Sequence, residues 1–413
     1  MLFAWYVTTG VRSNGVVIVR DGRTLAVGTG QQERVGAVEQ AIQKGLRKRP
    51  STGGRGAGLG RLLPLPRLHR PDRQSRHQSR GSARRLGQGR RSFPGLQRAR
   101  NRHGLLEENA ALVTSKKTLR AFDWCDLAQL GETYRGKVRD CLWGSDWGAI
   151  VTSDRISAFD AVFPQAIERK GEVLQSLAVH FLTLAEQIVP THLKEVIDPN
   201  AMLVRKARAL PVELVIRGYL TGSAWRDYQA GLLEAKYGLN LPDGLQQHAR
   251  LEKPVITPTT KEAAGHDQPI SCEQAAHITG RWDEIEAVVR QLYAQGVEWA
   301  AGRGLLLVDC KYELGLIDDQ LVLIDELHTP DSSRYWLNQP GDPVQLSKEF
   351  FREWLLSQGA DRVIDIPPVV AQAISERYLD LHQRLLGRDL PAPEEQDAQS
   401  RIYGRLKGIL CAS

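Results

Sequence analysis

Three charged residues alternate with apolar ones in the stretch 305-LLLVDCKYELGL-316, where Asp309, Lys311 and Glu313 are separated by single residues. A β-strand points successive side chains to opposite faces, so all three would lie on one face. The letters IDDQ then predict a turn, and the return strand ends at Asp325 and Glu326. Carboxylates on neighbouring strands suit Mg²⁺, a hard ion that also binds nucleotide phosphates. An amphipathic hairpin with a solvated face is the alternative interpretation.

Two further stretches carry cations that could bind anionic groups. In 134-YRGKVRDCLW-143, Lys137 and Arg139 lie at an expected strand–turn–strand, where Gly136 would let the backbone approach a phosphate. In 211-PVELVIRGYLTGSAW-225, a buried strand leads to Arg217 and then to a turn that holds Ser223. An arginine can bind a carboxylate or a phosphate through two parallel hydrogen bonds. A solvated turn and a strand end with a surface arginine are the alternatives.

A loop and the segment after the hairpin add polar residues. The loop 257-TPTTKEAAGHDQPIS-271 contains Lys261, His266 and Asp267, and 327-LHTPDSSRYW-336 adds Asp331 and Arg334. The loop has no HxH or HxxxH pattern that would indicate a metal. The stretches 151-VTSDRISAFD-160 and 168-ERKGEVL-174 can be read as ordinary turn and cap chemistry, because serine and aspartate favour both.

Both strands and helices must position these residues. The stretches 148–154 and 303–316 are strand-like, while 171–189, 271–304, 351–362 and 368–387 carry apolar residues at helical spacing. With 413 residues and 42% hydrophobic content, the chain can form a large core. The pattern predicts an α+β enzyme from about Leu119 onward.

In this order the motifs GKVRD, SDRISAFD, KGEVL, PVELVIRGYLTGSAW, TPTTK…GHD, DCKYELGL and IDELHTPDSSRYW closely resemble the SAICAR synthetase family. The similarity covers about residues 119–413. It implies a two-lobed α+β fold related to ATP-grasp, and a carbon–nitrogen ligase of purine biosynthesis. That ligase uses ATP and Mg²⁺ to join CAIR to L-aspartate through an acyl phosphate, giving SAICAR, ADP and phosphate.

The resemblance also implies roles for individual residues. Lys311 and Lys261 would be catalytic, with Lys311 beside the transferring phosphoryl group; Lys137 and Arg139 would bind ATP; Arg217, Ser223, Asp267 and Arg334 would bind substrate; and Glu313 and Asp325 would bind the metal. The stretch FPQAIERKG lacks the family's more usual Ile-Pro before Lys170-Gly171, which puts the role of Lys170 in doubt. The aspartate pocket is the least defined part of this assignment.

Residues 1–45 have a separate resemblance. The stretch 3-FAWYVTTGVRSNGVVIVRDGRTLAVGTGQQERVGAVEQAI-42 resembles a fragment of the bifunctional AICAR transformylase/IMP cyclohydrolase. It predicts two short strands joined by an Asp21-Gly22 turn, then a helix that ends at Gly45. Asn14, Gln31 and Arg34 would be its site residues. The rest of that site is absent, so we expect no transformylase activity.

Residues 46–118 separate the two similarities. Residues 46–104 hold 17 basic side chains and one acidic side chain, Asp72, whereas the rest of the chain is net acidic. The composition predicts disorder. Residues 54–70 can be encoded by codons whose bases, translated in a frame shifted by one base, give GAVLASDGFFPFPDSI. That peptide is similar to the continuation of the transformylase family. We therefore interpret 46–118 as an out-of-frame or disordered linker; a basic arm for nucleic acid is the alternative.

Composition also indicates the cellular context. The five cysteines are widely spaced and form no CxxC pair, which favours a reducing cytoplasm over a disulfide framework. The sequence has no run of about 18 apolar residues, so no membrane span is expected. The expected partners are the small molecules CAIR and L-aspartate, with no nucleic acid and no membrane. A homo-oligomer is compatible with the sequence.

Overall fold

A computed structural model describes residues 16–20, 23–28, 118–261, 267–341, 343–359 and 363–411. In the N-terminal part, β1 (Val16–Arg20) pairs antiparallel with β2 (Arg23–Gly28), which confirms the predicted strand pair. The helix expected before Gly45, the linker at 46–118 except its last residue, and Asn14, Gln31 and Arg34 lie outside the described residues. In the described part of the chain, no helix is long and apolar enough to cross a membrane.

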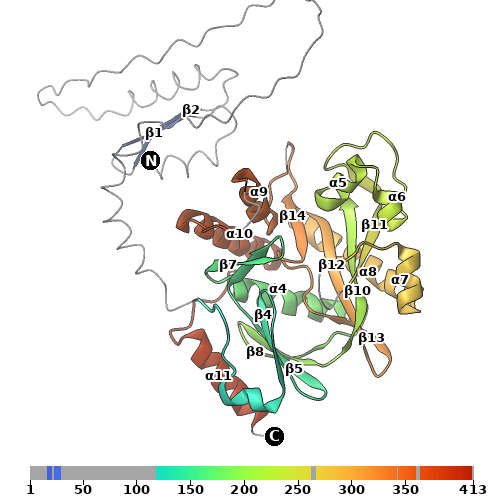
Figure 1. Ribbon diagram of the computed structural model, residues 1–413. Helices are drawn as coiled ribbons and strands as arrows, with labels where there is room; N and C mark the ends of the chain where they lie inside the picture. Colours follow the sequence, from blue (N-terminus) through green and yellow to red (C-terminus); the bar gives the residue numbers. More distant parts are fainter. Residues whose placement is uncertain are drawn as a thin grey trace, which may run out of the picture. The chain divides into compact units, whose positions relative to one another are not determined.

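The first large sheet is antiparallel, with strand order β3 (Glu132–Arg135), β4 (Arg139–Trp143), β5 (Trp147–Thr152), β9 (Ala201–Arg205) and β8 (Leu193–Asp198). The strand–turn–strand expected around Lys137 is therefore confirmed. The 3₁₀ turn η2 (Cys125–Leu130) and the C-terminal helix α11 (Ala398–Leu410) pack on this sheet through apolar residues that include Leu127, Ile402 and Leu406 (Figure 1). The sequence analysis missed α11.

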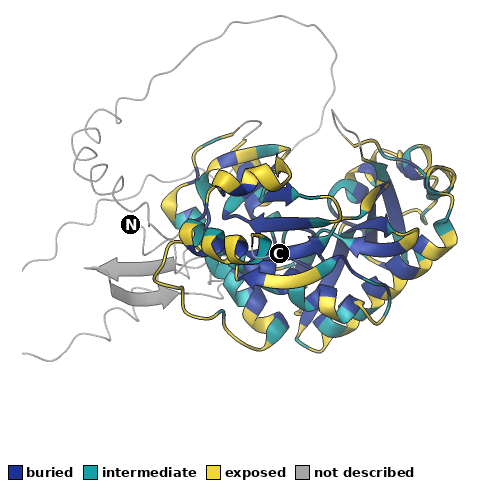
Figure 2. Cartoon of the chain, turned by 90° about the horizontal axis from the view of Figure 1, so that it is seen from below, coloured by how far each residue is buried: buried dark blue, intermediate teal, exposed yellow. Residues whose placement is uncertain are grey.

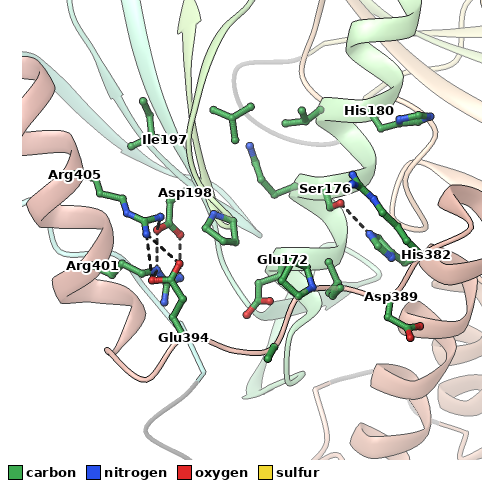
Figure 3. Close-up of a pocket in the computed structure, with 18 of the residues that line it drawn as sticks. Glu172, Ser176, His180, Ile197, Asp198, His382, Asp389, Glu394, Arg401 and Arg405 are labelled. Carbon is green, nitrogen blue, oxygen red and sulfur yellow. Dashed lines mark hydrogen bonds and ion pairs between the residues drawn. The ribbon is translucent and has the colours of Figure 1, made fainter.

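A buried ion cluster fixes α11 to the edge strand β8. The fully buried carboxylate of Asp198 accepts hydrogen bonds from Arg401 Nε at 2.8 Å and Nη2 at 3.0 Å, and from Arg405 Nη1 at 2.7 Å. Glu394 balances the second arginine at 3.0 Å. The cluster forms one wall of a cavity, with the Ser176–His382 pair on the other side (Figure 3). A carboxylate removed from water depends on such partners.

The second large sheet carries the alternating charges. Its order is β11 (Arg250–Thr260), β10 (Arg208–Tyr219), β12 (Leu305–Ile317) and β13 (Gln320–Ile324), and β14 (Ser333–Leu337) also pairs with β12. The predicted hairpin is present as β12 and β13, which pair antiparallel and are joined by Asp318 and Asp319. Strands are buried within each lobe, while helices keep exposed outer faces (Figure 2). A smaller hairpin, β6 (Arg155–Ala158) and β7 (Ala161–Ala166), lies outside both sheets.

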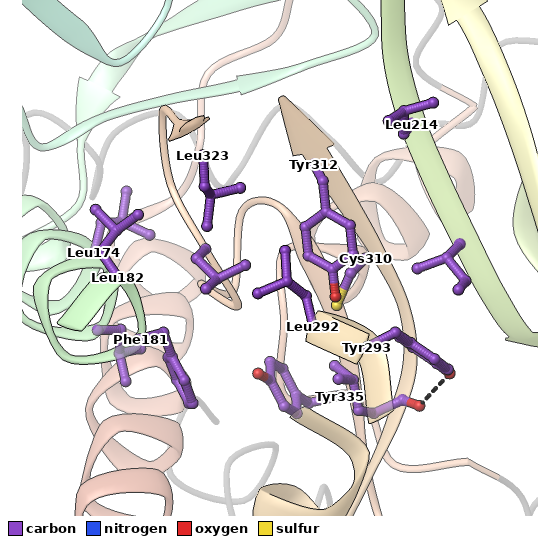
Figure 4. Packing of buried hydrophobic residues seen from close by; sticks show 14 of the residues in the cluster. Leu174, Phe181, Leu182, Leu214, Leu292, Tyr293, Cys310, Tyr312, Leu323 and Tyr335 are labelled. Carbon is purple, nitrogen blue, oxygen red and sulfur yellow. Dashed lines mark hydrogen bonds between the residues drawn. The ribbon is translucent and has the colours of Figure 1, made fainter. Parts of the chain in front are cut away.

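Five helices bury apolar residues in one core with the second sheet: α4 (Lys170–Ala185), α7 (Cys272–Thr279), α8 (Trp282–Ala301), α9 (Glu349–Ser357) and α10 (Pro368–Leu386). Helices α7 and α8 contact its strands, whereas α4 packs on α10 and also contacts β5 and β8 of the first sheet. Phe181 of α4, Leu292 of α8 and Tyr312 of β12 meet in one core (Figure 4). The segment expected as one helix over 271–304 is two, because Gly280 adopts φ +68° and ends α7. The short helices α5 (Gly222–Gln229) and α6 (Leu233–Tyr237) were not predicted.

The ion cluster on α11 gives a stability prediction. Arg401→Ala should lower the free energy of unfolding by about 3 kcal/mol, because it strips two hydrogen bonds from a buried carboxylate. Arg384→Ala is the matched control, since Arg384 pairs with Asp380 at the surface, where both side chains are about 40% exposed. That loss should stay within about 0.5 kcal/mol. Chemical denaturation of both variants measures the difference, and equal effects would contradict a stabilising role for the cluster.

Candidate active site

Two adjoining cavities lie where the charged face of β12 meets the β3–β4 turn. The larger, about 590 Å³, is lined by the turn residues 136–139 and by Lys311, Glu313 and Asp325. The smaller, about 230 Å³, is lined by Arg217, Ser223 and Arg334 among others. Lys311, Asp331 and Lys348 line both cavities. A group at that junction can therefore contact molecules bound on either side.

In the larger cavity, Arg139 joins the two sheets electrostatically. Its guanidinium contacts the Asp325 carboxylate and, at 2.6 Å, Glu326 Oε2. Burial works against the charged form, but these two carboxylates hold the pKa of Arg139 above its ordinary value. Lys137 is more exposed and pairs with Asp160 Oδ1 at 2.5 Å. The cavity therefore has one partly buried cation and one accessible cation near the same turn.

Lys311 lies among several carboxylates. Its ammonium contacts Glu313 and lies 3.5 Å from Glu213 Oε1 and 3.7 Å from Asp325 Oδ2. Lys261 contacts the other oxygen of Glu313. Burial opposes ionisation of both partners, yet their mutual attraction holds the pKa of Lys311 well above its ordinary value and that of Glu313 below it. Both groups are therefore charged.

Glu313, Asp325 and Glu326 offer the oxygen ligands that Mg²⁺ prefers. Burial raises the pKa of Asp325 to about 6, and the neighbouring charge of Glu313 adds to the effect of burial. A divalent cation would relieve this crowding, so the donor chemistry fits the metal. In the described part of the chain, no group of three or more metal-ligating side chains is already arranged around one point. Lys311 and Arg139 contact these carboxylates instead.

The smaller cavity presents two arginines that pair with carboxylates. Arg334 Nη2 lies 3.2 Å from Glu349 Oε2, which lines the same cavity. Asp309 Oδ2 contacts Arg334 and lies 3.4 Å from Arg217 Nη1, whose guanidinium also donates to Thr257 Oγ1 at 2.9 Å and to Ser223 Oγ at 3.2 Å. Gly222 has φ +60°, and a Cβ there would lie 2.5 Å from Arg334 Nη2. A side chain at position 222 would therefore displace the arginine. Each guanidinium group has several donors and can exchange a carboxylate partner for an oxygen of an anionic ligand.

A largely buried network supports the junction. Lys170 Nζ, with no exposed side-chain surface, donates to Asp331 Oδ2 at 2.9 Å, and Tyr378 donates to Oδ1 at 2.6 Å. Lys348 lies 3.3 Å from the same carboxylate and 3.2 Å from Ser157 Oγ. Despite burial, these cations hold the pKa of Asp331 below its ordinary value. Lys170, whose role was in doubt from the sequence, forms an internal ion pair.

The structure brings together most of the residues singled out from the sequence. Six line the larger cavity (Lys137, Arg139, Lys261, Lys311, Glu313 and Asp325), and Arg217, Ser223 and Arg334 line the smaller one with Lys311. Asp267 lines neither cavity. The pKa of Glu213 is raised by burial first, then by the charge of Glu313, and to a smaller extent by the charge of Asp267. Sequence reasoning missed Glu213 and Lys348. Glu213 lies four residues before Arg217 on β10, so the alternation of a strand places both on one face, and this pattern could have identified Glu213. Lys348 lies just before α9, and no pattern in the sequence marks it.

The cavity beside the Asp198 cluster is larger still, about 610 Å³, but none of the residues singled out from the sequence lines it. Four of its charged side chains, Asp198, Arg401, Arg405 and Glu394, pair with one another (Figure 3). The junction of the other two cavities is therefore the candidate active site.

Comparisons with known proteins find similarity in two parts of the chain. A family model described as SAICAR synthetase matches residues 132–366, and one described as AICARFT/IMPCHase bienzyme matches residues 1–44. Phosphoribosylaminoimidazole-succinocarboxamide synthase of Cytophaga hutchinsonii is 42% identical over 296 residues, covering 68% of this chain and 94% of that protein.

Solved structures show the same fold. SAICAR-synthase from Saccharomyces cerevisiae complexed with SAICAR aligns with a TM-score of 0.56 and 27% identity over 68% of this chain and 98% of that one. A type-2 SAICAR synthetase in complex with ADP aligns with a TM-score of 0.51 and 24% identity over 63% of this chain and all of that one.

The junction gives a prediction about Lys348. Burial, with a smaller contribution from the nearby Lys170, lowers its pKa to about 8, although Asp331 opposes the shift. NMR of lysine-labelled protein without ligands should show one ammonium group titrating near pH 8, absent in Lys348→Arg. An added anion such as ATP should move that midpoint upward, because negative charge favours the protonated amine. A midpoint near the ordinary lysine value, about 10.4, would contradict the assignment.

Proposed function

The chain belongs to the SAICAR synthetase family, and we propose that the two adjoining cavities are the site where it joins CAIR to L-aspartate. It is a ligase of purine biosynthesis. The observation that carries the site assignment is that Lys311, Asp331 and Lys348 line both cavities. A phosphoryl group passing from a nucleotide on one side to a carboxylate on the other must cross this junction.

ATP is assigned to the larger cavity. Lys137 and Arg139 follow Gly136 in a turn between two strands, and Lys137 is exposed enough to turn toward a phosphate. Mg²⁺ would be held by Glu313 and Asp325, with Glu326 beside them, and when bound would neutralise phosphate charge. Lys311 lies between these carboxylates and the smaller cavity, which suits contact with the transferring phosphoryl group.

CAIR and L-aspartate are assigned to the smaller cavity and its border with the larger one. Arg217, Ser223 and Arg334 provide donors for phosphate and carboxylate oxygens. Lys261, on the border of the larger cavity, and Asp267, outside both linings, are the remaining candidates for positioning the substrates. The phosphate and carboxylate groups of the substrates are anions that repel one another. Arg217, Arg334 and Lys261 are cations and would hold these groups close together.

The reaction would proceed in two displacements. A carboxylate oxygen of CAIR attacks the γ-phosphorus of ATP, and the bond to ADP breaks, giving an acyl phosphate. The amine of aspartate then attacks the acyl carbon, loses a proton, and phosphate leaves. Lys311 and Lys261 would stabilise the charge that develops on the phosphoryl and acyl oxygens, and cations that are already in place do so with little reorganisation.

We propose a division of the chain into a transformylase-like fragment at 1–45, an out-of-frame or disordered linker at 46–118, and the ligase at 119–413. The match of a second family model to residues 1–44 supports the first boundary. All ten assigned site residues lie after residue 136, so the extension is not needed for the reaction. Five free cysteines fit a cytoplasmic enzyme.

The proposal is tested by product formation. Purified full-length protein and a chain beginning at Thr118 should each release ADP and SAICAR only when ATP, Mg²⁺, CAIR and L-aspartate are all present. Chromatography measures both products. ADP release at the same rate with and without L-aspartate would contradict the ligase assignment. Loss of activity in a truncated chain that still folds would show that the extension takes part.

Arg217→Ala should lower kcat/KM by at least about 100-fold, because the variant loses a cation that binds the reacting anions. Asp309 keeps its contact with Arg334, so the fold should persist. Arg208→Ala is the matched control: Arg208 is exposed on the same strand, lines neither cavity, and should keep full activity. Equal kcat/KM values for the two variants would show that Arg217 does not take part in the reaction.

A further inference from the structure

The turn of the β6–β7 hairpin has an unfavourable residue at its tip. Ala158 pairs with Ala161, so Phe159 and Asp160 form a two-residue turn. Their φ values are +49° and +62°, the left-handed backbone of a type I′ turn. This turn favours asparagine, aspartate and glycine, and a bulky residue at positive φ is a genuine outlier. Phe159 is also 55% exposed. Both its backbone and its side chain are therefore unfavourably placed.

A second turn in the chain shows the ordinary solution. Asp318 and Asp319 join β12 to β13 with φ values of +49° and +61°. These values match the β6–β7 turn, but the residues are polar and suited to the left-handed region. Asp318 and Asp319 line neither cavity of the candidate active site. The difference between the two turns is therefore the phenylalanine and its location.

The β6–β7 turn adjoins residues that line the larger cavity. Ser157, two residues before Phe159, lines that cavity and accepts a hydrogen bond from Lys348 at 3.2 Å. Asp160 pairs with Lys137, the accessible cation of the β3–β4 turn. Both partners of this pair are more than half exposed, so the pair is weak and a phosphate can replace the carboxylate.

We propose that Phe159 is a positioning residue that closes over the reacting phosphate and excludes water. When ATP binds, its phosphates take Lys137 from Asp160, and the turn then lays the phenyl ring across the larger cavity. The inference rests on the proposed function, because an acyl phosphate is what needs protection. Burial of the ring in the closed state would explain why a strained, exposed aromatic residue lies beside the proposed phosphate site.

The competing reaction defines what the ring prevents. Water attacks the phosphorus of the acyl phosphate, the bond to the CAIR carboxylate oxygen breaks, and CAIR and inorganic phosphate are released with a proton. The net reaction is hydrolysis of ATP to ADP and phosphate without SAICAR. Closing a site against water suppresses such side reactions. The number of ADP molecules released per SAICAR therefore reports how well the site is covered.

The test compares Phe159→Asn with the matched control Asp318→Asn in the full-length protein. Wild type should release one ADP per SAICAR. Phe159→Asn should raise this ratio to about 2 or more, because water reaches the intermediate. Its Tm should equal or exceed that of wild type, because asparagine suits the turn. Asp318→Asn should keep the wild-type ratio, and Phe159→Leu, which restores an apolar cover, should return it close to 1.

An unchanged ratio in Phe159→Asn would overturn the inference, as would the same rise in Asp318→Asn. Phe159→Gly is a second variant that suits the backbone; if both it and Phe159→Asn fail to fold, the claim that phenylalanine strains the turn is wrong. Failure of wild type to form SAICAR would instead contradict the proposed function. The two failures are therefore distinguishable.

Discussion

The site depends on one strand that must satisfy two environments. On one face, Cys310, Tyr312 and Leu314 of β12 are buried in the apolar core; on the other, Lys311 and Glu313 face a cavity. Because the side-chain period of a strand is two, a shift of one residue would place charges in the core and apolar groups in the site. The pairing of β12 with β10, β13 and β14 fixes this register on both sides. The geometry of the junction is therefore set by packing beneath it.

Charge balance is the second constraint. Without ligands, the cations of the site are held by its own carboxylates: Lys311 by Glu313, and Arg139 by Asp325. Each pair avoids an isolated charge in a poorly solvated place. Binding a polyphosphate and a divalent ion would exchange these internal partners for external ones. Binding then rearranges ion pairs that already exist, and the cations are in place before the substrates arrive.

The sequence was most informative where its signals were local. Alternation predicted the face shared by Lys311 and Glu313, apolar spacing predicted α4 and α10, and the family motifs identified nine of the residues that line the two cavities. Contacts between distant segments carry no such signal. The bond between Lys170 and Asp331 spans 161 positions, and neither the place of Lys348 nor the attachment of α11 to β8 could be inferred from neighbours along the chain. The fold class and most of the site were thus predictable, whereas the supporting networks were not.

The attachment of α11 has a consequence for synthesis. The first sheet is complete once β9 ends at Arg205, but the helix that covers part of its apolar surface begins at Ala398. On the ribosome, nearly two hundred residues separate the sheet from its cover. The nascent lobe would therefore expose Leu142, Leu203 and their neighbours until translation ends, and this stage would be the one most dependent on chaperones.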